Sequence, residues 1–442
     1  MKGNLVAAPE TSWPSEAQGW YVTIVLLLGF TFSFVDRQVL NLLVEPIRAD
    51  LGLTDTQISL LQGFAFVVTY VSLSVPIGRM VDRFNRMRIM ICGILVWSAT
   101  TIACGLSRTY VQLLTARMGV GAGEAALTPA AWSVLADYFH PDRLARPISV
   151  YLMGPYIGAG IAMIAGAQVL DWTQTVDVIE LPLVGVIKPW QFTFIAVGLP
   201  GVLIALLFAT LKEPARRGRT DVAAVPPWRE VARYLAQERR IYIALHLGVP
   251  FIVVMLYGLQ AWVPTILVRV FDMDLADAGR QYGVVALFAG SAGVLTGPFV
   301  ERGLRAMGAK AAPLRVAMLG AISATFFLTL LPFVSSSVWA LVVIGGASFS
   351  VTLPLALITT VMQAVTPNEM RGVVNGLYVV TTNVLGLALG PTLVALTTDF
   401  VFADEQAVAQ SLAGVALVVG PTACLLLWSG TRAYAQRALT KG

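Results

Sequence analysis

Residues 20–44 read WYVTIVLLLGFTFSFVDRQVLNLLV, an apolar run in which Asp36 and Arg37 are the only charged residues. A helix that crosses the hydrocarbon core of a bilayer needs about 20 mostly apolar residues at a rise of roughly 1.5 Å per residue. The run therefore predicts a membrane-spanning helix. The residues before it are polar and lack the apolar core of a signal peptide, so we expect this span to be retained.

The composition extends this character to the whole chain. Of 442 residues, 57% are hydrophobic and only 12% are charged, and the mean hydropathy is +0.75. Soluble domains carry about 25% charged residues, so a soluble fold could not cover this much apolar surface. The three cysteines, Cys92, Cys104 and Cys424, all fall inside apolar runs, which argues against a disulfide framework or a closed zinc site. We predict an all-α membrane protein.

Eleven further apolar runs follow the first, each bounded by charged residues, prolines or glycines. Together they predict twelve spans, at residues 20–44, 56–77, 89–106, 110–136, 147–170, 190–211, 241–264, 276–299, 313–333, 338–363, 372–396 and 407–429. An even number of spans puts both termini on one side of the membrane.

The basic residues orient these spans. If both termini lie inside, 23 of the 30 Lys and Arg residues fall in or beside inner segments and five in or beside outer loops, and Arg37 and Arg117 remain deep within spans. Inner loops of membrane proteins carry the excess of basic residues, so we predict that both termini are cytoplasmic. The net charge of +5 then reflects topology and anionic lipid, and no nucleic-acid-binding motif is found.

The longest interruption between spans divides the chain into halves. We predict, in order, a cytoplasmic tail, a six-helix bundle, a cytoplasmic linker, a second six-helix bundle and a C-terminal tail, at residues 1–19, 20–211, 212–240, 241–429 and 430–442. The segment Gly-x-x-Val-acid-Arg at 78–83 is echoed by the same pattern at 297–302, which supports two repeated halves.

A short amphipathic pattern lies inside the linker. Trp228, Val231 and Leu235 share one helical stripe, with Arg229 and Arg233 opposite. The pattern favours a short helix on the inner membrane surface. A merely solvated linker is the alternative interpretation.

The stretch GRMVDRFNRMR at residues 78–88 resembles the loop signature of the major facilitator superfamily. The resemblance implies that superfamily's fold, twelve helices in two six-helix bundles. It also implies a cytoplasmic gate motif of Gly78, Asp82, Arg83 and Arg86, in which the acid and Arg83 form an ionic latch that favours the outward-open state. A solvated basic loop is the alternative interpretation.

A second motif lies in the fifth predicted span. Gly154, Pro155 and Gly158 resemble the Gly-Pro signature of exporters in the same superfamily. There the glycines allow close helix contact and the proline bends the span. Helix packing explains the same residues equally well, so the motif favours export only weakly.

Two further stretches are more specific. Phe34-Val35-Asp36-Arg37 in span one and the segment from Arg117 to Ala125 in span four together resemble the Spinster family, and WVPTILVR at 262–269 agrees with it. The resemblance covers essentially the whole chain. Sugar-acid and organic-anion symporters also carry an Asp-Arg pair in span one and a glutamate in span four.

Four charged residues are predicted to lie inside the membrane: Asp36, Arg37, Arg117 and Glu124. A charge at bilayer depth costs at least about 2.5–3.5 kcal/mol, so these residues are functional candidates. In Spinster-like transporters the matching acids are implicated in proton coupling and the arginines in state-dependent pairing or anion contact. A purely structural ion-pair cluster is the alternative.

The helical rise places these four residues at different depths. Asp36 lies level with Arg117 and could pair with it, and Arg37 needs another partner, with Glu124 as one possibility. Glu124 sits nearest the midplane, which makes it the better proton carrier on depth alone. We hypothesise that protonating Glu124 or Asp36 frees an arginine and so biases inward against outward opening.

The second half has no charged residue beyond the first five residues of any predicted span. It offers uncharged polar residues for the cavity instead: Tyr257, Gln260, Asn375, Tyr378 and Asn383. This asymmetry favours an amphipathic anionic substrate, and the Spinster resemblance implies a lysolipid or sphingolipid. An organic-anion or sugar-acid proton symporter is the alternative, and a scramblase or receptor a distant one. His246 is interpreted as a structural histidine near the inner interface.

The sequence carries no metal-ligand cluster, nucleophile elbow or phosphate loop, so we predict neither an enzyme, nor catalytic residues, nor a bound metal or cofactor. The predicted partners are the substrate, protons and membrane lipids, and we expect a monomer. The predicted location is the bacterial inner membrane, in multi-pass form.

Overall fold

The computed structural model describes residues 13–140, 143–173, 176, 178–182, 185–216 and 227–440. In the first half the elements are α1 (Glu16–Leu42), α2 (Val44–Leu51), α3 (Asp55–Ser59), the π-helical turn η1 (Leu60–Phe64), α4 (Ala65–Arg83), α5 (Arg86–Gly105), α6 (Tyr110–Glu124), α7 (Leu127–Tyr138), α8 (Ala145–Tyr151), α9 (Gly154–Thr173), β1 (Ile179–Leu181), β2 (Gly185–Ile187), α10 (Pro189–Gly198) and α11 (Gly201–Ala209).

The second half follows the linker helix. Its elements are α12 (Trp228–Gln237), α13 (Arg239–Ile243), η3 (Ala244–Gly248), α14 (Val249–Arg269), α15 (Leu275–Val285), η4 (Ala286–Gly290), α16 (Ser291–Ala306), α17 (Ala312–Leu330), η5 (Leu331–Phe333), α18 (Ser337–Thr352), α19 (Leu355–Val365), η6 (Asn368–Met370), α20 (Arg371–Thr381), η7 (Thr382–Ala388), α21 (Leu389–Leu396), η8 (Thr397–Phe402), η9 (Glu405–Ala407) and α22 (Val408–Thr440).

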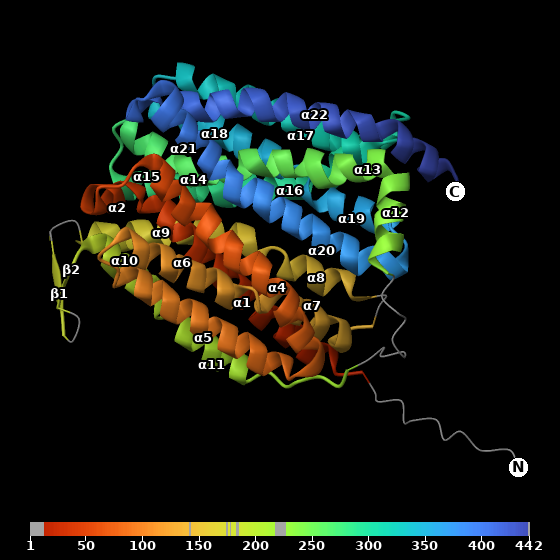
Figure 1. The fold of residues 1–442 in the computed structure, drawn as a ribbon, viewed down its shortest axis with the longest axis horizontal. Helices are drawn as coiled ribbons and strands as arrows, with labels where there is room; N and C mark the ends of the chain where they lie inside the picture. Colours follow the sequence, from red (N-terminus) through yellow and green to blue (C-terminus); the bar gives the residue numbers. More distant parts are fainter. Residues whose placement is uncertain are drawn as a thin grey trace, which may run out of the picture.

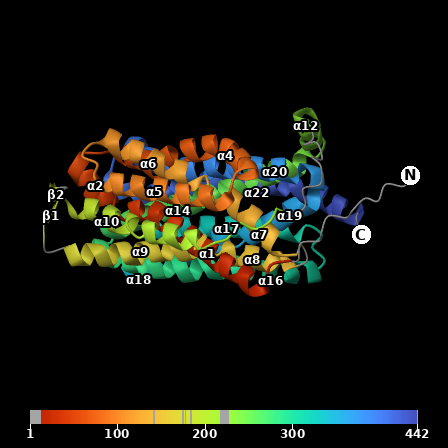
Figure 2. The same cartoon turned by 90° about the horizontal axis from the view of Figure 1, so that it is seen from below.

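Figure 1 shows the two halves as two layers of long helices that run nearly parallel, with α1 and α9 of the first half beside α14 and α15 of the second. One end of the molecule carries α2 and the β1–β2 hairpin, and we call it the hairpin end. The opposite end carries α12 and the end of α22, and we call it the termini end (Figures 1 and 2).

Eleven continuous helical segments among the described residues are long and apolar enough to cross a membrane. They correspond to eleven of the twelve predicted spans, with ends that differ from the predicted ones by at most eight residues. The remaining span, predicted at 110–136, is present as α6 and α7, which a turn at Ala125 and Ala126 separates. Pro129 explains the break, because a proline lacks the N–H that would bond residue i−4, here Ala125, and its ring clashes with that carbonyl.

The β1–β2 hairpin was not predicted. Its two short antiparallel strands pair Ile179 with Ile187 and lie in the loop between α9 and α10. Its strands are short and its position is outside the helical bundle, so the all-α class is unaffected. At the other end of the chain α22 continues to Thr440, so most of the residues predicted as a C-terminal tail prolong the last helix.

The predicted linker helix corresponds to α12. Val231 is buried, and the Tyr234 hydroxyl donates a hydrogen bond to the carbonyl of Val365 at 2.6 Å, which ties the helix to the second half. Trp228 remains 61% exposed. In Figure 2 the helix projects from the termini end. Residues 1–12 and 217–226 lie outside the described chain, so the predicted tail and linker boundaries stay predictions.

Candidate functional site

The structure brings the four intramembrane charges together between α1 and α6. Arg37 forms an ion pair and hydrogen bond with Glu124, and the two side chains are 8% and 2% exposed. Because a buried ion pair is weakened little by solvent, removing either partner would leave an uncompensated charge in an apolar bundle. Glu124 was one possible partner of Arg37 in the sequence analysis, and the structure contains this pair.

Aromatic rings enclose the Arg37 guanidinium. Its central carbon lies 4.3 Å from the centroid of Phe34 and 4.1 Å from that of Phe66. A guanidinium stacked on aromatic faces gains cation–π attraction, which is larger when water is excluded. Tyr257 of the second half also lies within electrostatic reach of Arg37. The group is thus held in one orientation by contacts from both halves.

Asp36 has no comparable support. Its side chain is completely buried, and neither carboxylate oxygen has a hydrogen-bond partner among the described residues. Arg117 does not bond that carboxylate: its Nη1 donates to the backbone carbonyl of Asp36 and its Nε to the carbonyl of Leu61, both at 3.3 Å. The predicted Asp36–Arg117 side-chain pairing is therefore not formed in this conformation, although the two residues are neighbours.

The predicted cavity residues of the second half divide into two groups. Tyr257 and Gln260 face α1, where Gln38 donates a hydrogen bond to the Gln260 side-chain oxygen at 2.8 Å. Tyr378 and Asn383 make contacts elsewhere: Tyr378 packs edge-on against His246, and Asn383 bonds the Val379 carbonyl of its own helix. Asn375 is half-buried on α20.

His246 is buried between two aromatic rings. The Tyr242 and Tyr378 rings both meet it edge-on, and its Nε2 lies 3.3 Å from the Val374 carbonyl. These contacts agree with the structural role that the sequence suggested.

Sequence reasoning missed an ion-pair network at the hairpin end, which we call the hairpin latch: Glu45, Arg48, Asp55, Arg269 and Glu405. Arg269 of α14 donates two hydrogen bonds to the Asp55 carboxylate, at 2.7 and 2.8 Å, and one to Glu45 at 2.8 Å. Arg48 binds Glu405 through both terminal nitrogens. Every one of these bonds joins the first half to the second.

One signal in the sequence pointed to this latch. Arg48 and Arg269 are two of only five basic residues assigned to the outer loops. Most Lys and Arg residues of a membrane protein lie in inner loops, so these two are exceptions to the rule. Each therefore needed a partner that the spans did not supply. The partners themselves, Asp55 and Glu405, are far away in the chain and could not be assigned.

Close contacts between the two halves continue from this end towards the middle of the spans. Gly63 in η1 packs so tightly on η7 that a β-carbon at this position would overlap the carbonyl oxygen of Leu387. Gly160 of α9 likewise approaches α15 and η4, where a β-carbon would lie 2.7 Å from that of Leu287. The two halves therefore pack closely from the hairpin end towards the middle of the spans.

Gly63→Val should push the two halves apart at the hairpin end, because the new side chain has no room beside Leu387. We expect a longer distance between spin labels on Arg108→Cys and Ser335→Cys, both exposed near this end, in a background without native cysteines. Gly303→Val is the control, since nothing lies within 4 Å of a β-carbon there. An unchanged distance in Gly63→Val would show that this contact does not hold the end closed.

A comparison with known families now decides the classification. The model of the Major Facilitator Superfamily matches residues 26–391, most of the chain. The chain belongs to the Major Facilitator Superfamily. It is accordingly a multi-pass membrane transporter and not an enzyme, and the twelve-helix fold predicted from the sequence is confirmed.

Relatives of this superfamily member include an MFS-type efflux pump of Mycolicibacterium smegmatis, 26% identical over 94% of both chains, and Protein spinster homolog 1 of Xenopus tropicalis, 28% identical over 86% of this chain and 73% of the relative. A probable L-galactonate transporter of Escherichia coli is 25% identical over 74% and 72%. The Spinster resemblance is thereby confirmed.

A solved structure has the same fold. The crystal structure of a bacterial homologue of the human lysosomal transporter Spinster, described as inward-facing and unoccupied, superposes with a TM-score of 0.77 over 97% of this chain and 98% of that one. The two sequences are 23% identical, so the likeness shows the fold alone.

The superfamily loop motif lies at the termini end. Arg86 is buried and bonds Glu213 at 2.7 Å and Ser133 at 2.8 Å, and it also pairs with Asp137. Ser133 and Asp137 belong to the first half and Glu213 to the segment that follows α11, so none of the three partners belongs to the second half. Arg83 is exposed without an ion-pair partner in the described part of the chain, and a β-carbon on Gly78 would meet nothing within 4 Å.

Two backbone carbonyls of the motif bind the segment that follows α11. Arg216 bonds the carbonyls of Asp82 and Val81, the latter at 2.8 Å, which again joins residues of one half. The bonds given for Arg86, Arg216 and their partners therefore leave the two halves unconnected at the motif, in contrast to the hairpin latch.

The Gly-Pro motif of the superfamily exporters serves helix packing in this chain. A β-carbon on Gly154 would lie 3.0 Å from that of Phe30, and one on Gly158 would lie 2.7 Å from that of Phe34, so both glycines sit against α1. Pro155 follows the break between α8 and α9, as expected for a proline that bends its span.

Among the described residues, no group of three or more His, Cys, Asp or Glu side chains is arranged to hold a metal ion. The cysteines are unpaired, with Cys92 exposed, Cys104 buried and Cys424 half-buried.

Proposed function

We propose that this superfamily member is a proton-coupled secondary transporter that works by alternating access, and that its conformation here is the inward-facing one. The hairpin latch closes one end, whereas the motif residues at the other end bond within the first half. The predicted topology has both termini inside the cell, which places the termini end on the cytoplasmic side of a bacterial inner membrane. An opening at that end faces inward.

The observation that carries proton coupling is the buried, unpartnered Asp36 carboxyl group. An isolated carboxylate in an apolar interior is costly, and protonation removes that cost. Asp36 therefore holds the proton in this conformation, while Glu124 is ionised and paired with Arg37. The pairing reverses the ranking from depth alone, which favoured Glu124 as the carrier.

Loss of that proton has an identifiable consequence. Nη2 of the neighbouring Arg117 has no partner in the described chain, so an ionised Asp36 would draw Arg117 towards its carboxylate. Arg117 would then release the carbonyl of Leu61, a residue of η1. Because η1 forms the close contact with η7 at the hairpin end, the exchange links proton release to opening of that end.

The substrate is an amphipathic anion, with a lysolipid or sphingolipid as the proposed class. Arg37 offers a positive group between aromatic rings, and the second half contributes apolar surface together with the polar groups of Tyr257 and Gln260. The likeness to Spinster homologues supports this class. The likeness to a probable L-galactonate transporter supports the alternative, a proton symporter for a sugar acid or another organic anion.

One experiment separates these proposals. The purified protein is screened by thermal shift against lysolipids and sugar acids, and the stabilising class is then followed in proteoliposomes after a pH jump. We expect stabilisation by lysolipids and accumulation that follows the proton gradient. Stabilisation by sugar acids alone would replace the lipid proposal with the alternative. Equilibration without accumulation at any pH gradient would instead indicate a scramblase or receptor.

A further inference from the structure

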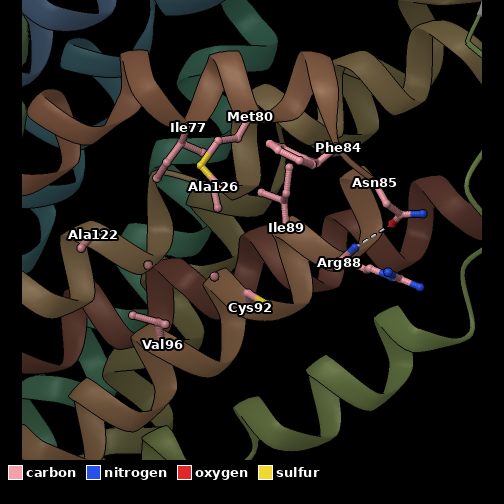
Figure 3. Close-up of a pocket in the computed structure, with 12 residues that line it drawn as sticks. Ile77, Met80, Phe84, Asn85, Arg88, Ile89, Cys92, Val96, Ala122 and Ala126 are labelled. Atoms are coloured by element: carbon pink, nitrogen blue, oxygen red, sulfur yellow. Dashed lines mark hydrogen bonds between the residues drawn. The ribbon is translucent and has the colours of Figure 1, made fainter.

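Residues of α4, α5 and α6 line a groove on the side of the first half. Its volume is about 370 Å³. Figure 3 shows Ile77 and Met80 of α4, together with Phe84 just after it, on one side and Ile89, Cys92 and Val96 of α5 on the other; Ala122 and Ala126 also line the groove. Ligand pockets span roughly 300–1,000 Å³, so the groove has the size of a binding site.

The lining of the groove suits hydrocarbon. Met80, Phe84 and Val96 are 45%, 60% and 46% exposed, and almost all of the lining surface is apolar. In a chain that crosses a membrane, such a surface on α4 and α5 faces lipid rather than water. The groove is therefore an apolar recess that could accommodate a lipid chain.

The mouth of the groove is basic. Arg88 and Asn85 lie at one end of it, where α5 begins, and the Arg88 main-chain N–H bonds the Asn85 side chain at 2.9 Å (Figure 3). The Arg88 guanidinium is exposed and has no ion-pair partner in the described ranges; the same is true of Arg79 and Arg83 on the last turns of α4. Unpaired arginines at the edge of a lipid-facing recess complement an anionic headgroup.

We propose that this groove binds an anionic phospholipid of the surrounding bilayer, with one acyl chain between α4 and α5 and the headgroup on Arg88. The groove also contacts Gly123 at the end of α6 and Ala126 in the break that follows Glu124. A bound chain would support this break from the side opposite the charged cluster. The site is separate from the proposed substrate path and does not depend on the proposed substrate.

The test is a titration of the detergent-solubilised chain with phosphatidylglycerol, followed by native mass spectrometry. We expect Arg88→Ala to weaken binding about fivefold, the factor that corresponds to roughly 1 kcal/mol for one arginine near an anionic surface. Val96→Trp should remove the tightest bound lipid by filling the groove. Two controls should bind as the wild type does: Leu95→Trp, exposed on α5 but outside the lining, and Arg315→Ala, at the corresponding start of α17.

A second measurement locates the lipid without changing the groove. Cys92 lines it and is exposed, whereas Cys104 is buried, so Cys424→Ala leaves Cys92 as the reactive thiol. Phosphatidylglycerol should slow maleimide labelling of Cys92 at least about threefold more than phosphatidylcholine does, as expected when the headgroup charge contributes to binding. Equal labelling rates with both lipids, or equal phosphatidylglycerol binding by all variants, would overturn the proposal. Tight binding of a single-chain lysolipid only would identify a different occupant and also contradict it.

Discussion

Asp36→Asn should abolish uphill, proton-driven uptake. The amide resembles a permanently protonated Asp36, and in this conformation both side-chain oxygens of Asp36 are buried without a partner. A chain that cannot release this proton cannot draw on the gradient, so the accumulation ratio should fall to about 1. The measurement is substrate uptake into proteoliposomes across a range of imposed pH gradients.

Glu124→Gln is the matched variant for the second acid. It removes the ion pair with Arg37 and leaves the Arg37 charge buried, so we expect a loss of thermal stability of the inward-facing form as well as impaired uptake. Asp36→Asn removes no hydrogen bond of the carboxylate and should retain stability. If uptake by Asp36→Asn depends on pH as steeply as uptake by the wild type, Asp36 has no part in proton coupling. The same result for Glu124→Gln would exclude Glu124.

Arg269→Ala should shift the conformational equilibrium away from the form closed at the hairpin end. Asp55 is completely buried and receives two hydrogen bonds from Arg269, and Arg48 approaches it at 3.2 Å. Loss of one partner of a buried pair costs about 3–5 kcal/mol, and because Arg48 remains, we expect the lower end, a shift of roughly 10² in population. The distance between labels at Arg108→Cys and Ser335→Cys reports the opening.

Two further variants test whether the effect of Arg269→Ala comes from loss of the hairpin latch or from the loss of any positive charge that pairs across the halves. Arg280→Ala removes a pair with Asp171 that also joins the halves, but the Arg280 side chain is 43% exposed, and such pairs contribute about 0–1 kcal/mol. It should leave the distance distribution almost unchanged. Adding Asp55→Asn to Arg269→Ala removes the stranded charge and should restore part of the closed population. A wild-type distribution in Arg269→Ala would mean that the latch does not hold this end.

The sequence predicted the spans closely because the bilayer imposes a length and a composition on each of them separately. α5, for example, runs from Arg86 to Gly105, against a predicted 89–106, and Asn85 caps its start by accepting a hydrogen bond from the Arg88 N–H. Span four was predicted in the right place but as one helix. Its break follows from Pro129, a local signal that was present in the sequence.

The candidate site was only partly predictable. The cost of charge in hydrocarbon singled out Asp36, Arg37, Arg117 and Glu124 without any structure. The same argument did not determine which of these residues pair with one another. Helical spacing shows which residues share a face of one helix, but it does not show which atoms meet across two helices. The Arg37–Glu124 pair and the Arg117 bond to a backbone carbonyl depend on how α1, α6 and η1 are rotated and packed.

The sequence by itself determined that the chain crosses a membrane many times, in two repeated halves, and that the first half carries a few charges within its spans. Hydropathy, periodicity and the depth of a charge in a span are properties of individual segments, so they can be read without a structure. The tertiary structure alone decided which end is closed. Arg269 meets Asp55, and Gly63 meets Leu387, across hundreds of residues of sequence, and contacts between two rigid bundles depend on their relative position, which no single segment encodes.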